Sequence, residues 1–173
     1  KYSGAAWIYE KKDYVWQLTQ LLFDSDGAED DNFGLSVAVC GQNAVVGVPK
    51  KDTNGGIDAG VAFVIEKKDN EIWNMIQLSA FDGSQRDLFG FSVSMSKNCI
   101  IVGAPGKNTS NGDIAGVVFI FERDESDAWY QKTSLRLLDG DRGDYFGNSV
   151  SICGNHAIIG ARFKDFSGDV TGA

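Results

Sequence analysis

Short stretches of alternating apolar and polar residues run along the whole chain, and they predict β-strands. After Phe89, the residues Phe91, Val93 and Met95 alternate with serines, as in a strand whose two faces differ. A turn then leads to residues 99–102, a short apolar run that is typical of a buried strand. No stretch keeps the 3.6-residue period of a helix, so the pattern predicts an all-β protein.

Two further strands follow these, which makes a unit of four. Residues 117–121 are β-branched and aromatic, as strand residues often are, and the fourth strand is expected from Trp129 to about Leu137. The same order recurs elsewhere, because residues 5–9 and 61–65 match the third strand. Four-stranded antiparallel meanders repeated in this way are the blades of a β-propeller.

Glycine and phenylalanine markers return every 56 or 57 residues and define the repeat. They are Phe33-Gly34 with Gly47 and Pro49, Phe89-Gly90 with Gly103-Ala104-Pro105, and Phe146-Gly147 with Gly160. Another glycine opens each third strand, at Gly4, Gly60, Gly116 and Gly172. We expect the phenylalanines to fill the gaps between blades and the glycines to allow close backbone approach. These markers are therefore interpreted as fold residues.

The phase of the repeat predicts how the blades divide the chain. A half blade is expected at 1–32, whole blades at 33–88 and 89–145, and another half blade at 146–173. These about three blade-equivalents are fewer than the usual four to eight of a closed ring. We therefore expect a partial propeller or a segment of a larger ring, with further blades from the same or another chain. Self-association into a ring is the alternative.

Composition narrows the choice of partners. The 173 residues carry a formal net charge of −8, which argues against a nucleic-acid partner. No apolar run approaches the roughly 20 residues of a transmembrane helix.

The lysine pairs at 11–12, 50–51 and 67–68 are interpreted as solvated loops. The three cysteines are expected to be small, buried free thiols, since equivalent positions in separate blades lie too far apart for a disulfide.

Acidic residues concentrate in the loops that join one blade to the next. The candidate binding residues are Asp24, Asp26, Asp30, Asp31, Asp82, Asp87, Asp139, Asp141 and Asp144. In a meander these loops share one face with the loops that follow Gly-x-Pro. One interpretation is a binding face for a cationic partner or a divalent metal, with Asp24, Asp26 and Asp30 as the best metal candidates. The favoured interpretation is turn chemistry, in which the aspartate two residues before each phenylalanine hydrogen-bonds the loop backbone.

Other candidate residues have simpler explanations. Arg142-Gly143-Asp144 spells a tripeptide that integrins recognise on their ligands, and we interpret it as chance. His156 is expected to be a solvated turn residue, and no catalytic residue is predicted. Asn108 begins a glycosylation sequon in a polar loop.

With period, strand order and motif together, the chain resembles the FG-GAP repeat family, whose repeats build the seven-bladed propeller of integrin α chains. The resemblance implies a ligand-binding or adhesion scaffold, extracellular or on the cell surface, that contacts protein or glycan. Integrin-type repeats often hold a calcium loop between Phe-Gly and Gly-Ala-Pro. Here those positions are short turns without carboxylates, at 40–43, 96–99 and 153–156. Calcium wants several carboxylates, so the family's calcium sites are not carried over and no cofactor is expected.

These features favour a non-enzymatic interaction scaffold that binds through the loops of one face. The first alternative is a structural repeat unit of a filament or larger assembly. A second is a propeller hydrolase, or a non-catalytic propeller attached to an enzyme domain outside this segment.

Overall fold

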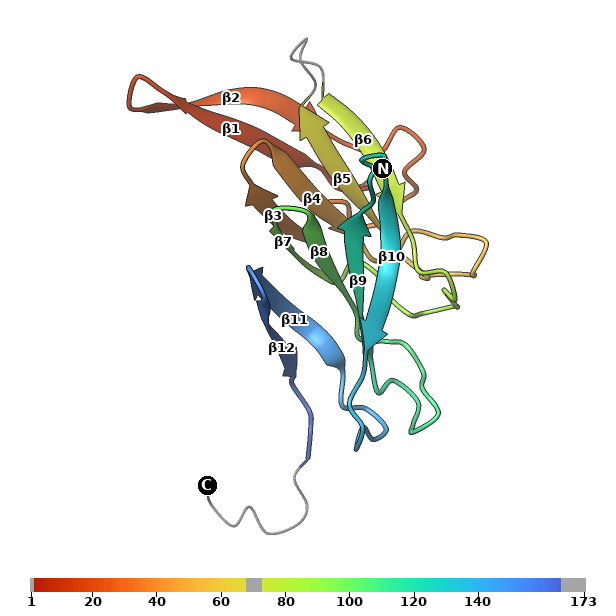
Figure 1. Cartoon of the computed structure of the whole chain (residues 1–173). Helices are drawn as coiled ribbons and strands as arrows, with labels where there is room; N and C mark the ends of the chain where they lie inside the picture. Colours follow the sequence, from red (N-terminus) through yellow and green to blue (C-terminus); the bar gives the residue numbers. More distant parts are fainter. Residues whose placement is uncertain (1, 68–72, 166–173) are drawn as a thin grey trace.

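Antiparallel strands account for the regular structure of the described residues, which are 2–67 and 73–165 of this computed structural model (Figure 1). Twelve strands lie in that part of the chain, as the repeat predicts, and no helix does. The strand ends differ from the sequence prediction in two places. Phe91 precedes the strand that it was expected to open, and the strand from Trp129 ends at Leu135 instead of about Leu137. Lys68 and the marker Gly172 lie outside the described residues.

The strands form two four-stranded sheets and two hairpins, each connected in chain order. The N-terminal hairpin pairs β1 (Ala6–Lys12) with β2 (Val15–Leu22). The first sheet holds β3 (Ser36–Cys40), β4 (Asn43–Val48), β5 (Val61–Lys67) and β6 (Trp73–Leu78). The second holds β7 (Ser92–Ser96), β8 (Cys99–Ala104), β9 (Val117–Arg123) and β10 (Trp129–Leu135). The C-terminal hairpin pairs β11 (Phe146–Cys153) with β12 (His156–Ala161).

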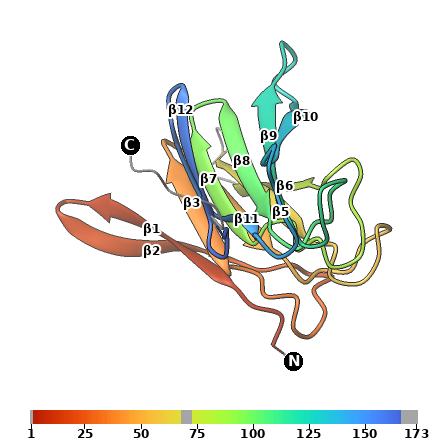
Figure 2. The same cartoon turned by 90° about the horizontal axis from the view of Figure 1, so that it is seen from below.

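The sheets stack face to face, as blades do. Figure 2 shows the first strands β3, β7 and β11 of successive repeats next to one another. The N-terminal hairpin supplies the third and fourth strands of a blade, and the C-terminal hairpin supplies a first and a second strand. Within the described residues the blades therefore form an open arc.

The hydrophobic core lies between the sheets, and β4 shows how alternation builds it. Val45 packs toward the second sheet, whereas its neighbour Val46 packs toward the N-terminal hairpin. Both residues are almost fully buried, because a strand between two blades is covered on both faces. Phe89 lies in the same core, with its ring centroid 5.5 Å from that of Phe119. The prediction that the repeated phenylalanine fills the space between blades is confirmed.

Neighbouring blades come closest at the repeated glycines. A Cβ atom on Gly47 would lie 1.9 Å from the carbonyl oxygen of Gly90, and one on Gly103 would lie 2.0 Å from that of Gly147. A serine on the first strand holds the same carbonyl: Ser92 Oγ donates to the Gly147 oxygen at 2.7 Å. The glycine of Gly-x-Pro is thus required by close approach between blades, as expected.

We predict that Gly103→Ala destabilises the protein by about 2–3 kcal/mol, because the added methyl group must displace the backbone of the next blade. Chemical denaturation measures the effect. Gly41→Asn is the matched control, since that glycine has a left-handed φ of 62° but open space around it, and asparagine tolerates this backbone. Equal stability of the two variants would contradict the assigned contact.

Candidate functional site

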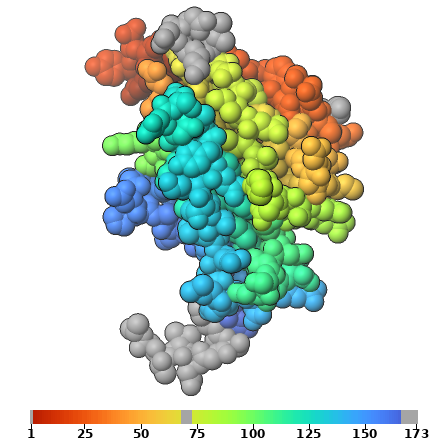
Figure 3. All heavy atoms as spheres, turned by 45° about the vertical axis from the view of Figure 1, so that its right-hand side comes forward, coloured from red at the N-terminus to blue at the C-terminus, as the bar shows by residue number. Residues whose placement is uncertain are grey.

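The loops between blades and the loops after Gly-x-Pro lie together on one face, as the meander predicts. The backbone N–H of Arg86 donates to the carbonyl of Ile57, with 2.8 Å between the two atoms. One repeat later, the N–H of Gly143 donates to the carbonyl of Asp113 at 3.0 Å. Figure 3 shows loop residues of successive repeats, from orange through yellow-green to blue-green, gathered along one side of the molecule. We call this surface the loop face.

Three of the candidate binding residues are buried in the loop face and cannot contact a partner. Asp31, Asp87 and Asp144 are 3%, 3% and 2% exposed. Each carboxylate accepts a hydrogen bond from the backbone N–H three residues earlier, at 2.7 Å for Ala28, 2.8 Å for Ser84 and 2.7 Å for Asp141. The predicted bond to the loop backbone is therefore confirmed. Assigning these three aspartates to the binding surface was wrong, because the fold uses their carboxylates internally.

A lysine from the glycine-containing loop that follows in the sequence, after the second strand of the same blade, reaches into each acidic loop. Lys107 Nζ lies 2.8 Å from the Asp87 carboxylate and donates to the carbonyl oxygen of Asp82 at 2.7 Å. The lysine side chain is only 10% exposed, so the ion pair is largely shielded from water. The acidic loop is thus built around a buried cation.

The same lysine occurs in the other repeats. Lys164 Nζ lies 3.3 Å from the Asp144 carboxylate and donates to the Asp139 carbonyl at 2.6 Å. Burial of this side chain opposes its charge, but the hydrogen bond to Asp144 and the charges of Asp139 and Asp144 raise its pKa above the ordinary value. Lys51, the equivalent lysine of the first repeat, pairs with a different aspartate of its loop, since its Nζ lies 2.6 Å from the Asp24 carboxylate.

Sequence reasoning missed these lysines, although the repeat contains the information. Lys51, Lys107 and Lys164 follow the equivalent glycines Gly47, Gly103 and Gly160 by four residues. The interpretation of the 50–51 and 67–68 pairs as solvated was wrong for Lys51, and also for Lys67, whose Nζ lies 2.9 Å from a carboxylate oxygen of Glu10.

The backbone around each buried aspartate is held in an uncommon conformation. Arg86 and Leu88, on either side of Asp87, have φ angles of 63° and 58°. Positive φ is uncommon for residues other than glycine and persists only where the surroundings enforce it. The corresponding residues of the other repeats also have positive φ, namely Asp30, Asn32, Gly143 and Tyr145. The three acidic loops therefore share one backbone conformation, which the surrounding contacts hold in place.

An apolar side chain projects from each loop just before the first aspartate. Phe23, Phe81 and Leu138 are 57%, 95% and 95% exposed. The exposed carboxylates of Asp82 and Asp139 follow directly, at 62% and 75%. Asp26, Asp30 and Asp141 are also exposed. Sequence reasoning overlooked these apolar residues, although Phe81 and Leu138 lie one repeat period of 57 residues apart.

The candidate metal ligands do not form an open site. Asp24 is occupied by Lys51 and by the backbone N–H of Asp26, which lies 3.1 Å from its other carboxylate oxygen. In residues 2–67 and 73–165, no group of three or more His, Cys, Asp or Glu residues is placed to hold a metal ion.

The remaining candidates fit local roles. In the Arg142-Gly143-Asp144 tripeptide the aspartate is buried against Lys164, so the tripeptide is not presented as a ligand. His156 is exposed at the start of β12 and pairs in register with Cys153. Asn108 is exposed, and its side-chain oxygen accepts the N–H of Ile114 at 2.8 Å.

The cysteines are free, but they are not all buried as expected. Cys40 and Cys99 are half-buried, whereas Cys153 is exposed. The expectation was wrong for Cys153 because no described blade covers that face of β11. Burial and the charge of Glu122 raise the pKa of the Cys99 thiol.

The stacked four-stranded meanders place the chain in the class of β-propeller repeat proteins. The FG-GAP repeat family matches residues 16–65, 74–121 and 129–173, which is most of the sequence, and the chain belongs to that family. A comparison with curated proteins gives no match. The described part of the chain contains no helix long and apolar enough to cross a membrane.

We predict that Lys107→Met lowers the unfolding free energy by about 3 kcal/mol, because it leaves the Asp87 carboxylate buried without its cation. Adding Asp87→Asn to this variant should recover part of the loss. Lys50→Met, at the exposed lysine next to Lys51, is the control and should change stability little. Urea denaturation of the four proteins measures these effects, and equal losses for Lys107→Met and Lys50→Met would refute the role of the buried pair.

Proposed function

We propose that this FG-GAP domain is a non-enzymatic interaction scaffold that binds a protein or glycan partner through its loop face. The observation that supports the proposal is the row of exposed apolar side chains at Phe23, Phe81 and Leu138, one in each inter-blade loop. Single exposed apolar residues are ordinary on protein surfaces. Here each of three successive inter-blade loops carries one, with Phe81 and Leu138 at the same repeat position and Phe23 two positions earlier, on loops whose backbone is fixed.

Rigid loops favour binding, because little conformational freedom is lost when a partner docks. Each projecting side chain has a neighbouring carboxylate, so an apolar contact is available beside a hydrogen-bond acceptor. Aromatic anchors surrounded by polar groups are typical of the residues that dominate binding energy. The exposed carboxylates add attraction for a partner with cationic side chains or hydroxyl donors.

The buried lysines and aspartates support a binding role without catalysis. Lys107 and Asp87 are the shielded ionisable pair of the second loop, and each is committed to contacts that hold the loop together. The two side chains therefore hold the loop backbone in the conformation that presents the exposed residues. A binding module of this kind fits an extracellular or cell-surface protein, and we infer that setting for this domain.

We predict that the double variant Phe81→Ser/Leu138→Ser loses at least about tenfold in affinity for partners of the wild-type domain, since two exposed apolar contacts are removed. Partners are identified by probing arrays of extracellular proteins and of glycans with the purified chain. Affinities are then measured by surface plasmon resonance.

Tyr14→Ser is the matched control for that experiment. Tyr14 is 93% exposed at the turn between β1 and β2, on the face opposite the loops. The Tyr14→Ser substitution should leave binding unchanged. Retained affinity in the double variant, or equal loss in the control, would show that binding does not use the loop face.

A further inference from the structure

We propose that Asn108 is the acceptor of an N-linked glycan on the loop face. Residues Asn108-Thr109-Ser110 form the sequon that this modification requires, and the 173 residues contain no other. The proposal rests on the extracellular or cell-surface setting inferred for this domain, because the sugar donor is met in the secretory pathway. The folded loop presents the asparagine in a way that suits attachment of a bulky polar group.

The two ends of the Asn108 amide have different surroundings. Its Oδ1 accepts the backbone N–H of Ile114 at 2.8 Å, a bond that closes the loop after Gly-Ala-Pro. Its Nδ2 makes no hydrogen bond within residues 2–67 and 73–165, and the residue is exposed. A glycan is attached through Nδ2, so attachment leaves the bond to Ile114 in place.

The equivalent residue of the preceding repeat explains the orientation of this amide. Asp52 lies 56 residues earlier, and its Oδ1 accepts the N–H of Asp58 at 2.9 Å. An ionised aspartate offers only acceptor oxygens, whereas asparagine adds an NH₂ donor. The loop therefore requires an acceptor at this position and nothing more. The Nδ2 group of Asn108 is not needed by the fold.

The loop backbone is alike in the two repeats. Thr109 pairs with Gly112 across a tight turn, as Thr53 pairs with Gly56 one repeat earlier. Ser110, the third residue of the sequon, lies exposed in this turn. Since the first repeat forms the same turn without a sequon, the sequon does not determine the shape of the loop. Changes to the sequon can therefore be made without changing the turn.

Asn108 lies between two of the acidic loops. Its neighbour Lys107 donates to the carbonyl oxygen of Asp82 at 2.7 Å. Three residues further along, Asn111 Nδ2 donates to the carbonyl oxygen of Leu138 at 3.0 Å. A glycan on Asn108 would thus project from the loop face between the second and the third acidic loop.

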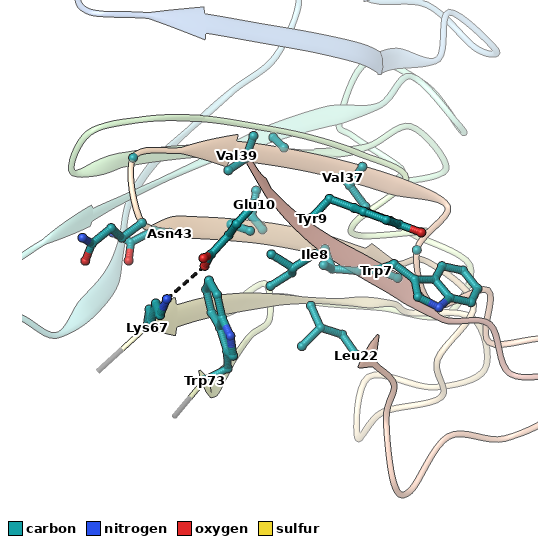
Figure 4. Close-up of a pocket in the computed structure, with 18 of the residues that line it drawn as sticks. Trp7, Ile8, Tyr9, Glu10, Leu22, Val37, Val39, Asn43, Lys67 and Trp73 are labelled. Atoms are coloured by element: carbon teal, nitrogen blue, oxygen red, sulfur yellow. Dashed lines mark hydrogen bonds and ion pairs between the residues drawn. The ribbon is translucent and has the colours of Figure 1, made fainter. Parts of the chain in front are cut away.

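A polar group that serves the fold is placed differently. Beside β1 lies a mainly apolar pocket of about 790 Å³, in which Glu10 points to Lys67 with 2.9 Å between the charged atoms (Figure 4). That carboxylate is committed to an ion pair between neighbouring blades. The Nδ2 group of Asn108 has no such commitment in the described part of the chain, so it is available for reaction.

The attachment transfers an oligosaccharide from a lipid-linked pyrophosphate donor. Nδ2 forms a bond to the anomeric carbon of the first sugar and releases one proton to solvent. The bond between that carbon and the pyrophosphate oxygen breaks, and the lipid pyrophosphate leaves with the bonding electron pair. Nothing is oxidised or reduced. The side chain stays uncharged, and Oδ1 keeps its role as an acceptor.

Mass spectrometry of the chain secreted from mammalian cells tests the site. An added signal peptide directs the chain into the secretory pathway, so the result does not depend on its native compartment. We expect most secreted molecules to carry one glycan. Peptide N-glycosidase should remove that glycan and leave an aspartate at position 108, which peptide mapping detects.

Three variants separate the sequon from the fold. Ser110→Ala removes the sequon but keeps the amide of Asn108, so the secreted chain should lack the glycan. Asn108→Asp keeps the acceptor for Ile114 and should give an unglycosylated chain with an unchanged circular dichroism spectrum. The double variant Asp52→Asn/Asn54→Ser places the same three residues in the equivalent loop of the first repeat, and it should gain a second glycan.

A folded, secreted wild-type chain with Asn108 unmodified would overturn the proposal. So would a glycan that persists in Ser110→Ala, or a double variant without a second glycan, because acceptance is assigned to this loop shape. The cellular setting is tested separately by the mass of the chain isolated from its native source. An unglycosylated native chain with a glycosylated secreted chain would refute the extracellular setting, while the acceptor site would stand.

Discussion

The fold depends on the close approach of one blade's backbone to the next at paired glycines. At Gly47 and Gly90, and again at Gly103 and Gly147, no side chain separates the two blades. This contact sets the distance between sheets, and a serine hydroxyl on the first strand holds the same carbonyl in place. With that distance fixed, each inner strand must be apolar on both faces, and each repeated phenylalanine has a defined space to fill.

Charged residues of the loop face have different roles according to whether they are buried or exposed. Asp87 and Lys107 are shielded and hold the loop, whereas Asp82 lies at the surface beside Phe81. Desolvation of the two charges offsets much of the attraction in a buried ion pair, so we infer that Lys107 and Asp87 fix the local structure of the loop more than they add to stability. The positive φ angles beside Asp87 are sustained by that local structure. Part of the acidic character of the sequence is therefore neutralised inside the loops, and only the exposed aspartates contribute charge to the surface.

The sequence was sufficient for the strands, their order and the roles of the glycines, because those features depend on periods of two and of 56 residues. It also indicated that Asp31 and its equivalents bind the loop backbone. It did not reveal that Lys51, Lys107 and Lys164 enter the acidic loops, since each lysine lies 20 or more residues from its aspartate. The exposure of Cys153 was likewise missed, because burial of a repeated position depends on which neighbouring blades are present.

The buried lysine in each acidic loop has a consequence for how the sequence of the loop face can diverge in evolution. Each loop receives the same cation, the same buried carboxylate and the same left-handed turn, whichever repeat it occupies. A loop transplanted from one repeat to another would therefore find equivalent supports in its new position. The side chains at its tip could then diversify one repeat at a time, while the framework beneath them stayed constant. The loops of different repeats are in this respect interchangeable, because each is supported by the same buried residues.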